Sequence, residues 1–163
     1  MTAILRPATP ADLPDIVRLV RDLAEYERLL PEFTAGEADF HRLLFAPDHV
    51  ADAVLAEADG HAVGIAIFHR TINTFKGRIG LFLEDLFVEP AYRGRGIGLA
   101  LLRHLARLAV ENDYNIIEWR VLDWNGPSIQ FYEALGAEKM TDWHVRRLFG
   151  AALIALAEGK SHG

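Results

Sequence analysis

The chain has 163 residues, a formal net charge of −6 and hydrophobic residues at 51% of its positions. This length suits one domain with a substantial core, and the hydrophobic content excludes a disordered chain. An acidic balance with no basic tail or stripe argues against a nucleic-acid partner. No apolar run reaches the length of a membrane span, and the stretch 1–7 lacks a signal-peptide core. We therefore expect a cytoplasmic protein with neither a nucleic-acid nor a membrane partner.

Cysteine is absent from the chain. Its absence excludes disulfides, thiolate metal ligands and any mechanism that holds an acyl group on a cysteine. The seven histidines do not occur at the spacings of common metal motifs. The sequence therefore predicts no metal site.

The first elements expected are a short strand at 3–6 and a long helix that follows it. Thr9 is a good N-cap, Pro10 suits the first helical position, and Asp12 adds an acidic residue to the first turn. Apolar residues then recur at helical spacing as far as Ala24.

The next elements expected are a second helix and a hairpin. The stretch 34–37, Thr-Ala-Gly-Glu, resembles a capping box that starts the second helix. Strands are expected at 50–58 and 62–69, because Asp-Gly at 59–60 is a strong hairpin turn. The stretch 71–78 is expected to be a polar loop.

The rest of the chain continues the alternation of strands and helices. Strands are expected at 79–88, 115–122 and 143–149, helices at 96–112 and 127–135, and a candidate terminal helix at 151–158. This order predicts an α+β (α/β-like) fold, with one mixed sheet flanked by helices in a single domain over 1–163.

A glycine-rich stretch, Arg-Gly-Arg-Gly-Ile-Gly at 93–98, lies between an expected strand and an expected helix. That order places free backbone N–H groups at a helix N-terminus, where the helix dipole favours an anion. Glycines also let the backbone approach a bulky phosphate or pyrophosphate. A Walker A loop is absent, and Leu99 or Leu101 stands where a Rossmann loop needs its third glycine.

The pattern that remains, Arg93-x-x-Gly96-x-Gly98, resembles the R-x-x-G-x-G/A pyrophosphate loop of the GCN5-related N-acetyltransferases (GNAT), which hold acetyl-CoA. A second stretch, 122–137, is similar to the N-x-x-[SA]-x-x-[FL]-Y-x-x-x-G-[FA] segment of the same superfamily. The two motifs occur in the expected order and on the expected elements. Together they imply a GNAT-type fold over essentially the whole chain.

Three further stretches resemble one group within this superfamily. Asp-Leu-Ala-Glu-Tyr-Glu at 22–27, Leu-Glu-Asp-Leu-Phe-Val at 83–88 and Trp-Asn at 124–125 are similar to the diamine (spermidine/spermine) N-acetyltransferases and their bacterial relatives. The variant Leu-Asp-Trp-Asn at 122–125 is nearer to the thialysine-acetylating branch. The loop 71–78 holds few carboxylates, unlike the polyamine enzymes.

The resemblance implies catalytic roles for Tyr132 and Glu84. Tyr132 would be the general acid that protonates the leaving CoA thiolate; the alternative is a core tyrosine packed beside Phe131. Glu84 would bind the substrate amine and accept its proton; the alternative is a structural ion pair. Because Glu84 and Asp85 are neighbours on a strand, we expect their side chains to point to opposite faces.

The resemblance also implies the binding residues. Tyr26 and Glu27 would lie at the mouth of the amine site, unless they are only a solvated helix end. A β-bulge near the 86–88 strand would expose backbone groups to the acyl and pantetheine parts. The residues expected to contact acetyl-CoA are Leu86, Phe87, Val88, Arg93, Gly94, Arg95, Gly96, Ile97, Gly98, Leu99, Asn125 and Ser128.

The function implied is direct transfer of an acetyl group from acetyl-CoA to a primary amine of a small cationic molecule: a diamine, polyamine or lysine analogue. One alternative is acetylation of another amine, in an amino acid, aminoglycoside or peptide. A second alternative is a non-catalytic acyl-CoA-binding module. The resemblance further implies a homodimer.

Overall fold

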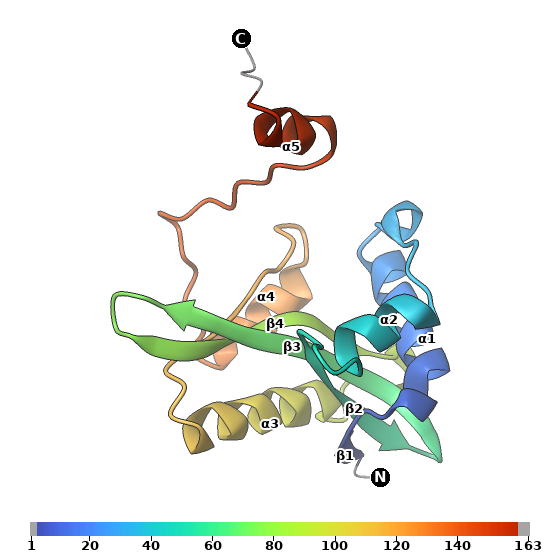
Figure 1. Cartoon of the computed structure of the whole chain (residues 1–163). Coiled ribbons are helices and arrows are strands. Elements are labelled where there is room, and N and C mark those ends of the chain that lie inside the picture. The colour runs from blue at the N-terminus through green and yellow to red at the C-terminus, as the bar shows by residue number, and fades with distance from the viewer. Residues whose placement is uncertain (1–2, 160–163) are drawn as a thin grey trace. The chain divides into compact units, whose positions relative to one another are not determined.

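A computed structural model describes residues 3–159, which divide into two compact units at Leu122/Asp123 (Figure 1). The elements of the first unit are β1 (Ile4–Pro7), α1 (Leu13–Tyr26), α2 (Glu37–Leu44), β2 (Asp52–Ala58), β3 (His61–Asn73), β4 (Arg78–Val88), α3 (Ile97–Glu111) and β5 (Ile117–Trp119), with the short 3₁₀ helices η1 (Pro10–Asp12), η2 (Leu30–Glu32) and η3 (Pro90–Tyr92). The second unit contains α4 (Gly126–Ala134) and α5 (Gly150–Ala157).

The first unit is built on a five-stranded sheet in the order β1-β2-β3-β4-β5. The first four strands are antiparallel to their neighbours, and β5 pairs with β4 in parallel. The predicted mixed sheet flanked by helices is confirmed. The single domain over 1–163 stays a prediction.

The two faces of the sheet have different covers. On one face Ile65 and Ile67 of β3 pack with α1 and α2 in a buried core. Ala66 and Phe68, which alternate with them along the strand, are also buried, and they point to the other face, which α3 covers (Figure 1). The continuous apolar run at 62–68 therefore specifies a strand that is buried on both faces.

A β-bulge interrupts the pairing of β3 with β4. Ile67 lies opposite Asp85, but the next residue, Phe68, lies opposite Leu83. Glu84 is therefore the extra residue of the bulge. The ladder between β4 and β5 also ends here, at the pair Leu83↔Trp119.

Helix α1 begins where Thr9 and Asp12 fix the chain. The backbone N–H and the hydroxyl of Thr9 donate hydrogen bonds to the Asp12 carboxylate, at 2.7 and 2.8 Å. Arg6 adds a bidentate pair to the same carboxylate, at 2.8 Å for each bond. The predicted start with Thr9 as N-cap is confirmed, with η1 as its first turn. These bonds anchor the helix whose far end carries Tyr26 and Glu27.

Three predicted boundaries in the first unit were wrong. The second helix starts at Gly36, whose N–H donates to Asp39 at 3.0 Å, and not at a Thr34 capping box. The polar loop 71–78 is mostly strand, because cross-strand pairs such as Ile72↔Ile79 extend the hairpin almost to its turn. The strand expected at 115–122 is only β5, since β4 offers it a ladder no longer than three residue pairs.

The second unit differs from expectation at 143–149, where a strand was predicted and none forms. Alternating apolar residues specify a strand only when a neighbouring strand supplies its hydrogen bonds. Residues 123–159 contain no strand that could do so. The predicted terminal helix is confirmed as α5, and helix α4 begins one residue before the predicted start.

Candidate acetyl-CoA and amine site

The glycine loop between η3 and α3 has the backbone geometry that an anion needs. Gly94 and Gly96 adopt left-handed conformations, with φ of 73° and 78°, which glycine adopts without strain. Apart from the neighbours of each glycine in the chain, no described atom lies within 4 Å of the place where a Cβ would stand on either residue. Gly96 is the N-cap of α3 and has no capping side chain. The first-turn N–H groups of Ile97, Gly98 and Leu99 have no acceptor within the helix, and a loop of this kind suits a pyrophosphate.

The arginine side chains of this loop bind protein. Arg93 donates from Nε to the Val88 carbonyl at 2.9 Å, and its guanidinium lies over the rings of Tyr26 and Phe87, at 4.6 and 5.5 Å. Arg93 thus fastens the loop to the end of α1 and to β4.

Arg95 is also directed back to its own segment. Its Nη2 donates to the Ala91 carbonyl at 3.1 Å, and its guanidinium lies 4.9 Å from the centre of the Tyr92 ring. Tyr92 in turn donates to Asp59 at 3.0 Å. These contacts hold the loop to the hairpin between β2 and β3.

The last residues of β4 have one edge without a strand. Leu86, Phe87 and Val88 pair with β3, whereas the ladder to β5 has already ended at Leu83. Within residues 3–159 no strand pairs with this edge. Backbone groups at such an edge are the donors and acceptors that an extended amide chain, such as pantetheine, takes up.

The bulge brings three carboxylates, Glu27, Glu84 and Asp85, towards one face of the sheet; we call them the acidic cluster. Asp85 lies opposite Ile67, which faces the core under α1 and α2. Glu84 binds His69. His69 lies two residues after Ile67 on β3, so the two side chains point to the same face of the sheet. The prediction of opposite faces was therefore wrong. Regular alternation fails at a bulge, where two consecutive residues oppose a single partner.

Asp85 is the most perturbed member of the acidic cluster. Burial, followed by the charges of Glu84 and Glu27, raises the pKa of its carboxyl from 3.8 to about 6. Among the described residues no hydrogen bond or ion pair is made to the Asp85 carboxylate. A half-buried carboxylate without a partner is costly in a structural role and suits a group that takes up a proton or a cation.

Glu84 has a different environment, because it is half-exposed and already paired. His69 Nε2 lies 3.1 Å from its Oε1, and Arg120 Nη2 lies 3.6 Å from its Oε2. Both partners also contact the Phe82 ring, His69 by stacking at 5.4 Å and Arg120 at 5.1 Å. Glu84 thus combines the two roles that the sequence left as alternatives: it lies in the candidate site and belongs to an ion-pair network.

Tyr26 and Glu27 lie at the C-terminal end of α1, beside the acidic cluster. The Tyr26 ring packs against the core and carries Arg93 above it. Burial raises the pKa of Glu27. The charge of Glu27 in turn contributes to the raised pKa of Asp85. These residues therefore connect the glycine loop with the acidic cluster, and the helix end is more than a solvated terminus.

The remaining candidate residues belong to the second unit. Asn125 is buried and caps α4 by accepting a bond from the Ser128 N–H at 3.4 Å. Tyr132 is half-buried on α4, with its ring centre 5.4 Å from that of Phe131. The helix, its cap and a left-handed Gly136 beyond its end occur as the sequence predicted.

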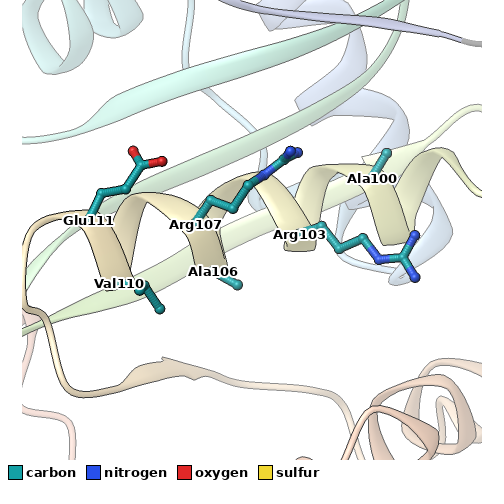
Figure 2. Close-up of a pocket in the computed structure, with 6 residues that line it drawn as sticks. All are labelled: Ala100, Arg103, Ala106, Arg107, Val110 and Glu111. Carbon is teal, nitrogen blue, oxygen red and sulfur yellow. The ribbon is translucent and has the colours of Figure 1, made fainter.

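A hollow of about 670 Å³ lies along the solvent side of α3 (Figure 2). Its lining consists of Ala100, Arg103, Ala106, Arg107, Val110 and Glu111. Because α3 covers the face of the sheet opposite to α1, this hollow is separate from the acidic cluster.

Sequence reasoning did not select Asp85, His69 or Arg120. Asp85 was visible as a carboxylate in an apolar strand, but its exposure to the site depends on the bulge. His69 and Arg120 carry no motif, and only the pairing of β3, β4 and β5 brings them to Glu84.

In the range 3–159 no group of three or more metal-binding side chains is placed to hold an ion. Over the same range no helix has the length and apolar character needed to cross a bilayer.

The acetyltransferase (GNAT) family model matches residues 14–137. The chain therefore belongs to this family and is an acetyl-transferring enzyme that uses acetyl-CoA as co-substrate. This membership sets aside the alternative of a non-catalytic acyl-CoA-binding module.

Individual relatives agree with this membership. The chain is 34% identical to the thialysine N-epsilon-acetyltransferase of Bos taurus, over 94% of this chain and 96% of the relative. It is 29% identical to the L-ornithine N5-acetyltransferase NATA1 of Arabidopsis thaliana, over 96% and 88% respectively. Among solved structures, an integron cassette protein from the V. cholerae mobile metagenome superposes with a TM-score of 0.81 at 25% identity, over 97% of this chain and 99% of that one.

Proposed function

We propose that this enzyme acetylates a primary amine of a small cationic molecule, such as a diamine, a polyamine or a lysine analogue, by direct transfer from acetyl-CoA. The observation that carries the proposal is the unpaired, half-buried Asp85 with its raised pKa, next to Glu27 and Glu84. Such a cluster attracts an ammonium group and offers it a proton acceptor. The relatives that act on thialysine and on ornithine support an amine acceptor of this size.

Acetyl-CoA supplies the activated acetyl group. The chain's own residues bind the cofactor and the amine, and they transfer the protons. The N–H groups of the glycine loop hold the pyrophosphate, and the free edge at Leu86–Val88 takes up the amide groups. Asp85 accepts the proton that the ammonium must lose before its nitrogen can attack, because its raised pKa lies near neutral pH. Glu84 and Glu27 orient the ammonium.

Tyr132 is the proposed general acid. As the new C–N bond forms and the C–S bond breaks, its hydroxyl gives a proton to the leaving sulfur, and the proton from the amine goes to Asp85. This role rests on its place in the motif 122–137. Homodimer formation stays a prediction of the resemblance, and a cytoplasmic location stays a prediction from the sequence.

The proposal is tested by incubating the protein with acetyl-CoA and a panel of amines, and measuring free CoA release and acetylated product. The panel contains diamines, polyamines, diamino acids, an aminoglycoside and a peptide. Acetylation of small cationic amines is expected. Acetylation confined to the aminoglycoside or the peptide would contradict the proposed substrate class.

A further inference from the structure

A permanent cation lies beside the acidic cluster. Arg120 follows β5 and places its guanidinium 5.1 Å from the centre of the Phe82 ring and 3.6 Å from Glu84. His69 approaches the same two residues from β3. The site therefore has an acidic end, formed by Glu27 and Asp85, and a cationic end, formed by Arg120, with Glu84 between them. Both ring nitrogens of His69 are already in contact, one with Glu84 and the other with the Arg70 carbonyl.

Arg120 retains most of its hydrogen-bonding capacity. A guanidinium has about five N–H donors, and the contact of 3.6 Å to Glu84 is longer than a hydrogen bond. Its side chain is 52% exposed, and within residues 3–159 Glu84 is its one ion-pair partner. A half-exposed guanidinium supported by an aromatic ring is well suited to bind a planar carboxylate with two parallel hydrogen bonds.

Two charged ends of opposite sign discriminate between kinds of amine. A diamine or polyamine that places one ammonium at Asp85 brings its second ammonium towards Arg120, where like charges repel. A diamino acid brings its carboxylate there instead. In an extended diamino acid the side-chain nitrogen and the carboxylate are roughly 6–8 Å apart. This is close to the distance of about 7 Å between residues i and i+2 of a strand, which share a face of the sheet.

We propose that Arg120 binds a carboxylate of the acceptor, so that the enzyme selects the side-chain amine of a diamino acid over a simple diamine or polyamine. This inference rests on the proposed function and narrows its substrate class. It assigns to Arg120 the role of a specificity-determining residue.

The test uses substrates that differ only by the carboxylate: L-ornithine against putrescine, and L-lysine against cadaverine. For the parent enzyme kcat/KM is expected to be at least about tenfold higher for each amino acid. In Arg120→Gln the value for the amino acids should fall by about 10- to 100-fold, mainly through KM, which is the scale of charge-assisted hydrogen bonds. The values for the diamines should stay equal or rise, because Glu84 loses its counter-ion.

Two further variants separate the role of Arg120 from a general effect of removing a surface charge. Arg120→Lys keeps the charge but loses the bidentate geometry, and it should recover part of the preference. Arg78→Gln is the matched control, because Arg78 also lies on an exposed part of this sheet but pairs with Asp113; it should change neither substrate.

The outcomes separate this inference from the proposed function. Equal kcat/KM for the matched substrates in the parent, or an equal fall for both in Arg120→Gln, would overturn the carboxylate role and leave amine acetylation intact. If no small amine is acetylated, the proposed function itself fails.

Discussion

The glycine loop and the acidic cluster are two parts of one candidate site, and their geometry has different origins. The loop is local: its conformation follows from the alternating glycines at 94, 96 and 98 and from the helix that starts there. The acidic cluster combines residues from α1 and β4, and it exists because one extra residue in β4 shifts the register against β3. In the proposed function, a local pattern decides where the cofactor is held, whereas long-range strand pairing decides which carboxylate meets the amine.

The largest expected effect lies outside both regions and sets the scale for comparing them. Tyr132→Phe removes the proposed general acid and should lower kcat by about 10²- to 10⁴-fold, while the affinity for acetyl-CoA measured by calorimetry stays unchanged. Tyr114→Phe is the control, because Tyr114 lies in the connection between α3 and β5 and belongs to no candidate site; it should keep full activity. An unchanged kcat in Tyr132→Phe, with chemistry shown to limit the rate, would make Tyr132 a packing residue.

Within the acidic cluster the two neighbours on β4 should differ. Asp85→Asn removes the proton acceptor but keeps the side-chain shape, and kcat for a preferred amine should fall by about 10²-fold. Glu84→Gln removes a half-exposed carboxylate and should act mainly on KM, by about tenfold or less. A larger loss of kcat in Glu84→Gln than in Asp85→Asn would reverse the assignment.

Asp85 should also make stability depend on pH. Its pKa in the folded protein, about 6, lies above the ordinary value of 3.8, so the folded state binds the proton more tightly than the unfolded state. The parent should therefore lose up to about 2–3 kcal/mol as pH rises from 4 to above 6. Asp85→Asn cannot ionise and should be more stable than the parent above pH 6, with little difference at pH 4. Denaturant unfolding at both pH values measures this, and equal curves at pH 7 would contradict the buried-carboxylate account.

The smallest expected effect concerns the glycine loop. Gly96→Ala introduces a Cβ into the open space over the loop and strains a φ of 78°, so KM for acetyl-CoA should rise by about tenfold. Gly60→Ala is the matched control, because Gly60 has a φ of 82° and the same open surroundings in the β2–β3 turn. Both variants should lose similar stability, and only the first should lose cofactor affinity. Equal affinity in the two variants would show that the loop does not hold the pyrophosphate.

The same contrast describes how much of the protein was predictable from its sequence. The start of α1 at Thr9, the helix after Gly96 and the cap at Asn125 were predictable, because each depends on neighbours within a few residues. A bulge near 86–88 was expected only from the resemblance, and its place at Glu84 was not predictable, since nothing in the run at 83–88 marks which residue loses its partner. The strand expected at 143–149 failed for the related reason that the described residues of its unit contain no partner strand.

The pH dependence of kcat/KM for a preferred amine tests the central claim most directly. Three enzymes are compared between pH 5 and 9: the parent, Asp85→Asn and Glu84→Gln. The account predicts that the parent shows an inflection near pH 6, in addition to the rise towards the pKa of the amine. Glu84→Gln should keep this inflection but at lower pH, because the charge of Glu84 helps to raise the pKa of Asp85, and Asp85→Asn should lack it. An inflection that persists in Asp85→Asn, or that disappears only in Glu84→Gln, would contradict the claim that the bulge makes Asp85 the proton acceptor.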